Sequence, residues 1–536
     1  STVGGALTAT ATAGDITQST GTALRITGAA SFTAAGGQII TLDGNNTFDD
    51  TSNEGATDAA VTFAAASGNL LGVTINDSDE FNLVALTLAQ VLNAGGNLSV
   101  TAGGNITQSG ALVVPGTTTI SAPGSTVTLS ISSNDFRGAV SIDARSVDLE
   151  SSGAIVLGAS AVTGTAVGTE YKVEAGGTVT QLGVLIIAPT TTIVAGSNHV
   201  TLENTSNNFQ GTFGITSAGN VSLVNSNTID LGTSTLSGTF DVTAKAGNIT
   251  QSGNLTVSDD TKASTFKTEG TGADIILNTL AHTNALAGTV KLTTTGSGGD
   301  ASIDNGTTKL IITDGSSVGG TLKLVSGHAS GITDAGTLTV FTDLYATTDA
   351  NNGVITLDGL SVSGKIQIVT DGSGGTGGNA TVANTTGLDF IKADVGGNLT
   401  AIAENGPIKC ENSCEFYIDG TTDVWSKTAL NRNIILDNPL NDFTGTVRFR
   451  GGAVVIKDAD DIVFGTSDST AAESKDDLNG NPYALKVYAG DEITDTTGNL
   501  LITGGHAWFG TNNESTEGKI VLDSSGNIFG GTLSLE

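Results

Sequence analysis

The sequence predicts an all-β protein, a right-handed parallel β-helix (β-solenoid) made of short strands, with sequence repeats of about 70–90 residues. Three observations lead to this prediction. The composition is rich in strand and turn formers, three landmarks recur in a fixed order, and short apolar triplets follow one another at a regular spacing.

The composition favours strands over the large cores of a globular enzyme. The chain has 536 residues, including 74 Gly, 6 Pro, 2 Cys and no Met, and its aromatic fraction is 4%. The branched Cβ atoms of Thr, Val and Ile fit a pleated surface, while Gly, Asn, Asp and Ser are the usual turn residues. A hydrophobic fraction of 38% argues against a disordered chain.

The first landmark is an Ile-Thr-Gln-Ser segment, which is intact in three places and altered in four others. The copies begin at Ile16, Ile106, Val179, Ile249, Ile332, Ile408 and Ile493. Successive copies start between 70 and 90 residues apart. Self-similarity at such a period is the sequence signature of a repeat architecture.

Two further landmarks keep step with the first. A Phe follows an Asn-rich turn in most copies, namely Phe48, Phe136, Phe209, Phe443 and Phe529. Leu286 and Val362 are placed at this position in the two remaining copies. A Leu-Gly-x-Ser or Phe-Gly-x-Ser segment comes next, at residues 157–160, 231–234 and 464–467. Three landmarks in a fixed order indicate a true repeat.

Each repeat contains a finer spacing of apolar triplets. Val140-Ser141-Ile142, Val147-Asp148-Leu149 and Ile155-Val156-Leu157 begin 7 and 8 residues apart. Alternation places two residues of each triplet on one side of a strand. A strand of three to five residues cannot bury that side within one hairpin, so we expect stacked coils of about 20–25 residues with inward columns of apolar side chains.

A string of immunoglobulin-like sandwiches is the competing fold, because repeats of about 80 residues also suit such domains. The chain has only 2 Trp and 5 Tyr to fill the cores of such domains. Its apolar triplets are also spaced too closely for the longer strands of a sandwich domain, and no Pro-rich linkers separate the copies. The coil is therefore favoured.

Sequence character divides the chain into three parts. Residues 1–403 are expected to form regular solenoid repeats, and residues 404–495 a divergent, more charged repeat that carries both cysteines. Residues 496–536 are expected to form a final partial repeat, continuous with the same rod. Because the first and last repeats are incomplete, we expect end-to-end self-association or continuation in a longer chain.

A Gly-Asn-Ile-Thr-Gln-Ser-Gly turn at residues 104–110, the run from Gly116 to Ile120 and the Val-x-Leu triplets together resemble the filamentous-haemagglutinin-like repeat proteins. These are large bacterial surface adhesins, typically exported by two-partner secretion. The resemblance covers nearly the whole chain and implies a right-handed β-helix and an extracellular location. It implies no catalytic residues.

The formal charge of −32, from 21 basic and 53 acidic residues, repels phosphate backbones and anionic lipids. We therefore expect no nucleic-acid partner. No apolar run reaches the roughly 18 residues of a membrane span, so no membrane insertion is expected.

The sequence contains no catalytic motif that we can identify. His199, His282, His328 and His506 lie in different repeats, and none has a second ligand at metal-binding spacing. There is no Gly-x-Ser-x-Gly elbow and no Walker loop. The sequence therefore indicates a protein that is not an enzyme.

The alternative function is that of a carbohydrate-binding or polysaccharide-degrading β-helix, whose sugar-binding face would lie in residues 404–495. This stretch is unusual in carrying Arg432, Arg448, Arg450 and Trp425. Trp425 and Trp508 are the residues we would expect to stack on sugars, although packing in the core is the simpler interpretation of each.

Two acidic clusters are candidate Ca²⁺ sites, because this ion prefers carboxylate and other oxygen ligands. The candidate residues are Asp77, Asp79 and Glu80 in one cluster and Asp458, Asp460 and Asp461 in the other. A further acidic pair occupies residues 476–477. Solvated carboxylates are the simpler interpretation, and no other cofactor is expected.

Cys410 and Cys414 are predicted to form a local disulfide. In the repeat alignment they replace Gln108 and Leu112, which flank a turn. An extended strand would hold residues four apart at about 13 Å, whereas a turn brings them within bonding range. Such a bond implies an oxidising compartment. Two free thiols or an intermolecular bond are the alternatives.

These features predict a mechanical function. We expect an extracellular structural or adhesive rod at a bacterial cell surface, such as an adhesin stalk, a surface-layer component or a filament subunit. Surface glycans are candidate partners of such a rod.

Overall fold

The computed structural model describes residues 1–48, 60–90, 95–279, 281–349, 352–370, 377–410, 413–427, 432–469, 483–495, 498–511 and 518–536. In these residues the chain forms strands and turns and no helix, and so none that could cross a membrane. The strands stack in parallel as a β-solenoid of about 21 turns. The predicted all-β solenoid of short strands is confirmed.

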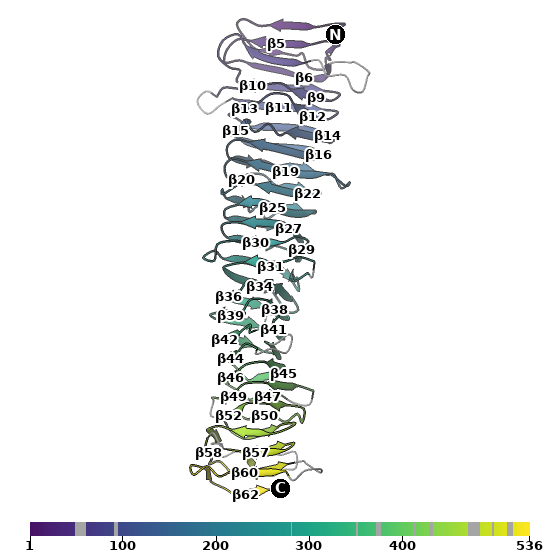
Figure 1. Ribbon diagram of the computed structural model, residues 1–536. Coiled ribbons are helices and arrows are strands. Elements are labelled where there is room, and N and C mark those ends of the chain that lie inside the picture. Colours follow the sequence, from purple (N-terminus) through teal and green to yellow (C-terminus); the bar gives the residue numbers. More distant parts are fainter. Residues whose placement is uncertain are drawn as a thin grey trace. The chain divides into compact units, whose positions relative to one another are not determined.

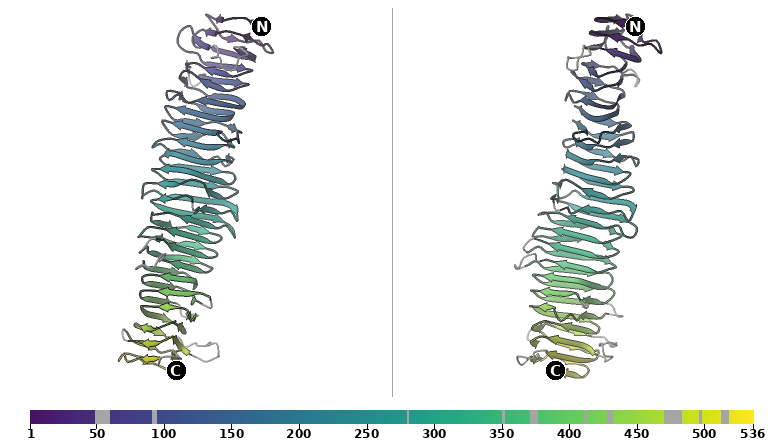
Figure 2. Two further views of the ribbon diagram at one scale, coloured as in Figure 1. Left: turned by 45° about the vertical axis from the view of Figure 1, so that its right-hand side comes forward. Right: turned by 90° about the vertical axis from the view of Figure 1, so that its right-hand side faces the viewer.

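Two compact units make up the chain, Ser1–Asp259 and Asp260–Glu536. Unit 1 runs from β1 (Thr2–Val3) to β30 (Leu255–Val257), and unit 2 runs from β31 (Ser264–Thr271) to β62 (Leu533–Leu535). Within each unit the strands of successive coils lie side by side (Figures 1 and 2). The divisions at residues 403 and 495 describe changes of sequence character inside unit 2.

Parallel register fixes the coil length in unit 1. The strand β14 (Thr118–Leu129) pairs with β16 (Ala139–Ser151), which pairs in turn with β19 (Glu170–Ala175). Thr118 lies opposite Val140, and Val147 lies opposite Tyr171, so these coils take 22 and 24 residues. Both lengths fall in the range that the triplet spacing predicts.

The core of unit 1 is built from columns of inward side chains. One column, in which each member is in register with the next and fully buried, consists of Leu129, Leu149, Val173, Ile193 and Ile215. Each such side chain contributes about 1.5–3 kcal/mol to folding when it leaves water. The branched and apolar residues of the triplets therefore hold one coil against the next.

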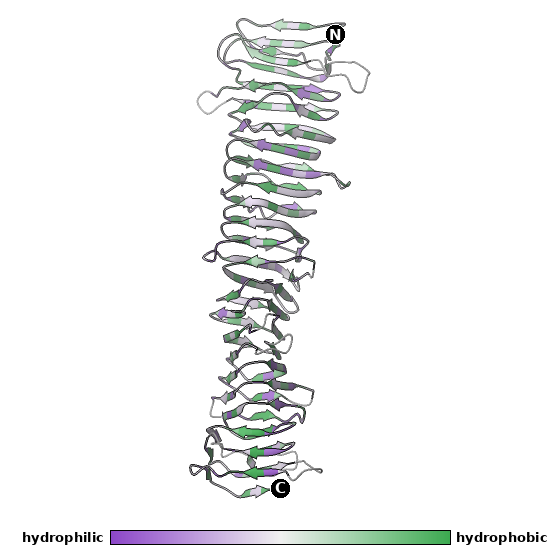
Figure 3. Ribbon diagram, viewed as in Figure 1, coloured by the Kyte–Doolittle hydropathy of each residue, from purple (hydrophilic) through white to green (hydrophobic). Residues whose placement is uncertain are grey.

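The outward side of the same strands is polar. Lys172 on β19 lies in register with Asp148 on β16, and its Nζ is 3.4 Å from Asp148 Oδ1. Figure 3 shows the resulting alternation of hydrophobic and hydrophilic residues along the strands. This alternation is the period-two pattern of a strand with one buried face.

Unit 2 repeats the arrangement. Its strands include β35 (Ala301–Asp304), β38 (Leu322–Ser326), β41 (Leu344–Thr348) and β43 (Ile366–Val369). One inward column of these strands, in register and buried, consists of Ile303, Leu324, Ala346 and Ile368. The same physical device therefore stabilises both units.

Candidate functional site

Buried polar side chains occupy the turns where the strand ladders break. The first kind is an amide pair that uses the Gln of the first landmark. Gln108, at the end of β12 (Ile106–Gln108), donates from Nε2 to Asn134 Oδ1 at 2.7 Å, and Asn134 Nδ2 donates back to Gln108 Oε1 at 2.9 Å. The same reciprocal pair is formed by Gln18 with Asn46 and by Gln181 with Asn207.

The Asn of this pair also satisfies the backbone. Asn134 Oδ1 accepts the N–H of Leu112, the first residue of β13 (Leu112–Val114), at 2.9 Å. Its Nδ2 donates to the carbonyls of Leu129 and Glu150. A buried backbone group without a partner costs about 1–3 kcal/mol, so this Asn stabilises three strand ends together.

A second polar position clamps the landmark Phe. In unit 1, Asn225 Oδ1 accepts the N–H of Phe209 at 2.9 Å, and Asn225 Nδ2 donates to the Phe209 carbonyl at 3.2 Å. In unit 2, Asn305 makes the same two bonds to Leu286 and Asn384 makes them to Val362. Leu286 and Val362 therefore occupy the landmark position that the sequence assigned to them.

The Ser of the third landmark forms the third clamp. Ser160 Oγ accepts the N–H of Ile142 at 3.0 Å and donates to the carbonyl of Gly158 at 3.3 Å. Ser467 repeats both bonds with Phe449 and Gly465. All three landmarks thus take part in hydrogen bonds at the turns, and this role was missed in the sequence, where they served only to count repeats.

Cys410 and Cys414 are joined by a disulfide, with their Cα atoms 5.2 Å apart, and both side chains are buried. Cys410 ends β47 (Ile408–Cys410) in the position that Gln108 has in its own coil. Gln108 Nε2 closes its turn by donating to the Gly110 carbonyl at 2.8 Å, whereas Cys410 closes the corresponding turn by a covalent bond.

The alignment of the second cysteine with Leu112 is wrong. The residue whose N–H donates to the clamping Asn is Leu112 in one copy and Phe416, bonded to Asn441 Oδ1 at 3.1 Å, in the other. Phe416 therefore takes the place of Leu112, and Cys414 lies two residues earlier. The turn that carries the disulfide is two residues longer, which equal spacing in the alignment could not reveal.

The candidate calcium ligands point in different directions. Asp77 and Asp458 are buried, at 1% and 5% exposure, while Asp79, Glu80, Asp460 and Asp461 are exposed. Among the residues that the structure describes, no three His, Cys, Asp or Glu side chains are grouped to hold a metal. The calcium hypothesis stays a prediction, which the effect of chelation on the melting temperature would test. Residues 476–477 lie outside the described ranges.

Asp77, the last residue of β8 (Gly72–Asp77), is held as a turn residue. Its Oδ1 accepts the N–H of Phe48 at 3.5 Å and that of Asp79 at 3.4 Å. The pKa of Asp77 is raised from 3.8 to about 7, chiefly by burial and in smaller part by the charge of Asp79, while the backbone bonds oppose the rise.

Asp458 follows β53 (Val454–Lys457) and is held in the same way. Its Oδ2 accepts the N–H of Phe443 at 3.3 Å and its Oδ1 accepts that of Asp460 at 3.0 Å. Burial raises the pKa of Asp458 from 3.8 to about 7, and the charges of Asp442 and Asp460 act in the same direction.

Trp425 lies on the outward side of β49 (Thr422–Ser426), with 36% of its surface exposed. Its ring centroid is 4.8 Å from Lys427 Nζ and 5.3 Å from Arg450 Cζ. Arg450, on β52 (Thr446–Gly451), is its register neighbour, and Lys427 also bonds to Glu404 at 2.6 Å. The result is an outward patch in which an aromatic ring lies beside two cations.

Trp508 packs against neighbouring side chains and is not exposed at the surface. It is 7% exposed, and its ring centroid lies 4.4 Å from that of Tyr488. Gly510 is in register with Tyr488, and a Cβ at Gly510 would overlap the indole. The glycine therefore leaves the space that Trp508 fills.

Three of the four histidines bond within turns. Nδ1 of His199, His328 and His506 accepts a backbone N–H from Asn220, Ser330 and Thr532 respectively. In each case the imidazole accepts a backbone N–H, and this bond fixes the orientation of the ring.

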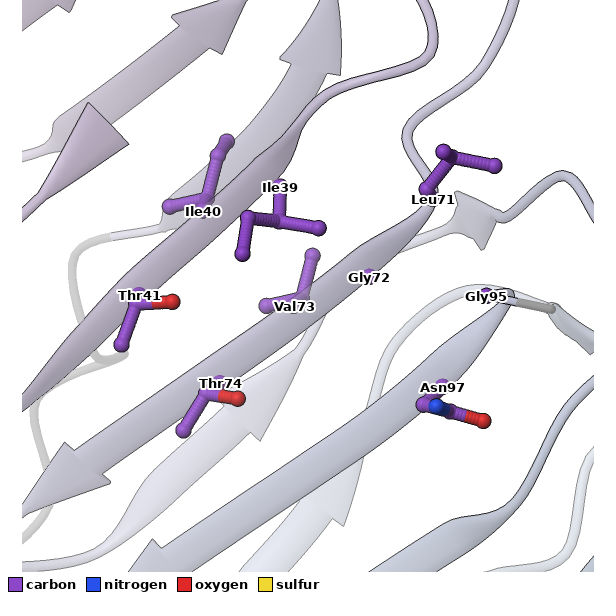
Figure 4. A pocket seen from close by; sticks show the side chains of 9 residues that line it. All are labelled: Ile39, Ile40, Thr41, Leu71, Gly72, Val73, Thr74, Gly95 and Asn97. Atoms are coloured by element: carbon purple, nitrogen blue, oxygen red, sulfur yellow. The ribbon is translucent and has the colours of Figure 1, made fainter. Parts of the chain in front are cut away.

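Unit 1 also has an open depression of about 330 Å³ across the outer faces of β6 (Ile39–Phe48), β8 and β11 (Asn97–Ala102). Figure 4 shows its side chains, which include Ile39, Thr41, Thr74 and Asn97. None of the residues that line it is titratable.

The chain matches one family model in six segments, residues 1–53, 67–143, 144–216, 218–293, 377–450 and 451–536. The family is described as repeats of unknown function (DUF5649). No curated protein and no solved structure matches the chain. The six matched segments account for most of the chain's length. They lie in the solenoid whose turns carry the repeated hydrogen bonds described above. The chain therefore belongs to the family of repeats of unknown function, DUF5649.

Proposed function

We propose that this chain is an extracellular structural or adhesive element of a bacterial surface, such as an adhesin stalk, a surface-layer component or a filament subunit, and not an enzyme. The observation that carries the proposal is the repetition of one stabilising design in both units. Apolar columns face inward, hydrogen-bonded turns join the strands, and polar and charged groups such as Lys172 and Asp148 face outward.

Stiffness follows from this design. Each coil is hydrogen-bonded to the next along the strands, and the turns between strands are fixed by buried side chains instead of solvent. Local opening of a coil would have to break ladder bonds and expose apolar columns together. Such a unit would transmit force along its ladders, which is the property that a stalk needs.

Two features support the extracellular location. The Cys410–Cys414 disulfide is of the kind that persists in oxidising compartments. The resemblance to filamentous-haemagglutinin-like adhesins, carried by the Gly-Asn-Ile-Thr-Gln-Ser-Gly turn, favours the same location and an adhesive role.

Protease treatment of intact producing cells tests the proposal. The chain should be removed or released from the cell exterior by an external protease, and Cys410 and Cys414 should resist alkylation until a reductant is added. A cytoplasmic marker protein is the control for cell integrity. Protection of the chain together with that marker, and free thiols at both cysteines, would reject the extracellular role.

End-to-end contact is part of the proposal. In the described part of the chain, β62 pairs with β59 (His506–Thr511) on one side, and an open ladder edge of this kind accepts a further strand. In this proposal the further strand comes from another copy of this chain. Negative-stain electron microscopy should show filaments or longer particles as concentration rises, and uniformly dispersed single particles would contradict self-association.

Glycan binding is a second candidate function, which the exposure of Trp425 beside Arg450 favours. A ring and a cation on one face can contact the apolar side and an acidic group of a sugar. On a glycan array, Trp425→Ala should lose the signal, while Tyr345→Ala, an outward ring beside Lys323, should keep it. Equal signals for the two variants and the unchanged chain would reject this face.

A further inference from the structure

The backbone N–H of the second-landmark residue, usually a Phe, donates to a buried side-chain oxygen in six described turns. In two of these six turns the side chain is a carboxylic acid. The side chains whose oxygen accepts the landmark N–H are Asp77, Ser151, Asn225, Asn305, Asn384 and Asp458. All six are nearly or fully buried. One position in the fold is therefore filled by an amide in three turns and by a carboxyl group in two.

The amide uses both its acceptor and its donor at this position. Asn225 Nδ2 donates to the carbonyls of Phe209 and Thr228, and Asn384 Nδ2 donates to those of Val362 and Gly387. The turn therefore gathers carbonyl oxygens around the side-chain nitrogen. An ionised carboxylate has no donor to offer them.

The two carboxyl groups lack that donor bond. Asp77 Oδ1 accepts two backbone N–H bonds, and Asp77 Oδ2 has no hydrogen-bond partner although it is buried. Asp458 uses both oxygens as acceptors. A buried oxygen without a partner is costly, and a proton on it would supply the donor that the Asn has.

The charges near Asp77 disfavour its ionised form. Its own turn carries Asp79 and Glu80, and β6, which pairs with β8, carries Asp43. The strand on the other side, β11, has no charged residue. Like charges and burial both favour the neutral acid.

The surroundings of Asp458 act in the same direction. Carboxylates lie in its own turn, at Asp460 and Asp461, and on β51 (Asp442–Phe443), at Asp442. The cations on the adjoining strands are Lys457 and, on β56 (Tyr483–Ala489), Lys486, and each Nζ lies over the ring of Tyr488 on the outward side. The net local charge therefore does not stabilise a buried carboxylate.

We propose that Asp77 and Asp458 each bind a proton in the folded protein and act as neutral replacements for the asparagine of the other turns, so that loss of this proton loosens the turn it clamps. The raised pKa of each group, near neutrality, sets the range in which this occurs. The two turns are tightest in acidic surroundings, and they open more readily as the pH rises to about 7, above which the effect is complete. The turns clamped by Asn225, Asn305 and Asn384 have no such dependence.

Hydrogen–deuterium exchange of the full chain tests the proposal. The amide protection of the peptides that contain Phe48 and Phe443 is compared between the unchanged chain and Asp77→Asn or Asp458→Asn at the same pH, which cancels the intrinsic rate. From about pH 5.5 to about pH 8.5 the unchanged chain should lose about 30-fold in protection relative to each variant, because each pH unit between the open-state pKa of 3.8 and the folded-state pKa of about 7 is a factor of ten and the loss levels off above it. The peptide that contains Phe209 serves as the internal control.

Asp460→Asn is the matched control variant, because it removes an exposed carboxylate from the same turn and should leave the pH dependence in place. A protection ratio that stays constant with pH in both Asn variants would overturn the proposal. Infrared spectra of the unchanged chain provide a reading that needs no variant. At about pH 6, where exposed carboxylates are ionised, a protonated carboxyl band should be present, and its absence would also overturn the proposal.

Discussion

Gly138 lies directly against Gly116 of the preceding coil. A Cβ at Gly138 would be 2.5 Å from the carbonyl carbon of Gly116 and would overlap its oxygen. The same closeness recurs where Gly211 meets Pro189 and where Gly183 meets Ala159. Glycine at these corners therefore permits neighbouring coils to approach at strand spacing.

The change Gly138→Ala is expected to destabilise unit 1 by about 2 kcal/mol, because the added methyl group pushes two backbones apart. Urea denaturation followed by circular dichroism measures the loss. Gly153→Ala is the matched control, since the nearest atom to its Cβ would be 3.9 Å away, and its effect should stay within about 0.5 kcal/mol. Equal effects of the two changes would contradict the close approach of the coils.

The change Asn134→Leu is expected to cost about 3 kcal/mol, because the buried N–H of Leu112 would lose its acceptor and Gln108 would lose its amide partner. The free energy of unfolding, again from urea, is the measurement. Asn227→Ala, at an exposed turn with only long hydrogen bonds, is the control and should change stability by less than about 0.5 kcal/mol. A loss no larger than that of the control would show that the amide pair is not a stabilising element.

The solenoid itself could be predicted because its determinants are local and repeated. Alternation in Val147-Asp148-Leu149 identifies the buried side of a strand, and the stacking of Leu149 on Leu129 and Val173 follows from register. The roles of Gln108 and Asn134 could not be predicted in the same way, since they depend on two turns 26 residues apart meeting in space. The signal was nevertheless present, because an Asn precedes the landmark Phe by two residues at Phe48, Phe136, Phe209 and Phe443.

Reduction of the Cys410–Cys414 disulfide is expected to cost about 2 kcal/mol, because the bond closes a loop of only a few residues. The melting temperature of unit 2 with and without reductant measures the effect, and Cys410→Ser with Cys414→Ser should reproduce it without reductant. Intact mass under non-reducing conditions is the control for the bond. A mass two units above that of the oxidised chain would show two free thiols.

The change Asn225→Asp is expected to introduce a new pH dependence into unit 1. A carboxyl group at this buried position should, like Asp77, have a folded-state pKa well above its unfolded value of 3.8, as Asp77 does at about 7. The folded state then binds the proton more tightly, so the stability it contributes is present below about pH 4 and is lost as the pH rises through about 7. The penalty should be smallest near pH 4 and grow by about 1.4 kcal/mol for each unit of pKa shift.

Urea midpoints of Asn225→Asp and of the unchanged chain, measured between about pH 4 and about pH 8, check this prediction. Asn227→Asp places the same charge on the exposed part of the turn and should show no such growth. A penalty of the same size at every pH would mean that the buried acid stays ionised.

The buried residues that bond the turns also show where sequence reasoning fails for single residues. Asp77 and Asp458 were grouped with their acidic neighbours as calcium ligands because adjacency in sequence was the only guide. In the structure Asp458 is buried, whereas Asp460, two residues later in the same turn, faces solvent. Similarly, the longer turn at Cys414 shifts the residue that meets Asn441 to Phe416, which spacing alone could not show.

The central claim is that adjacent coils are parallel and in register. Paired cysteines at outward register neighbours test it most directly, with Thr119→Cys and Ser141→Cys in unit 1 and Ser302→Cys and Lys323→Cys in unit 2. A short bis-maleimide reagent should link each pair within one molecule, whereas Thr119→Cys with Thr192→Cys, which lie in coils that are not adjacent, should stay unlinked. Failure of both register pairs to cross-link, as expected for a string of antiparallel sandwiches, would contradict the account.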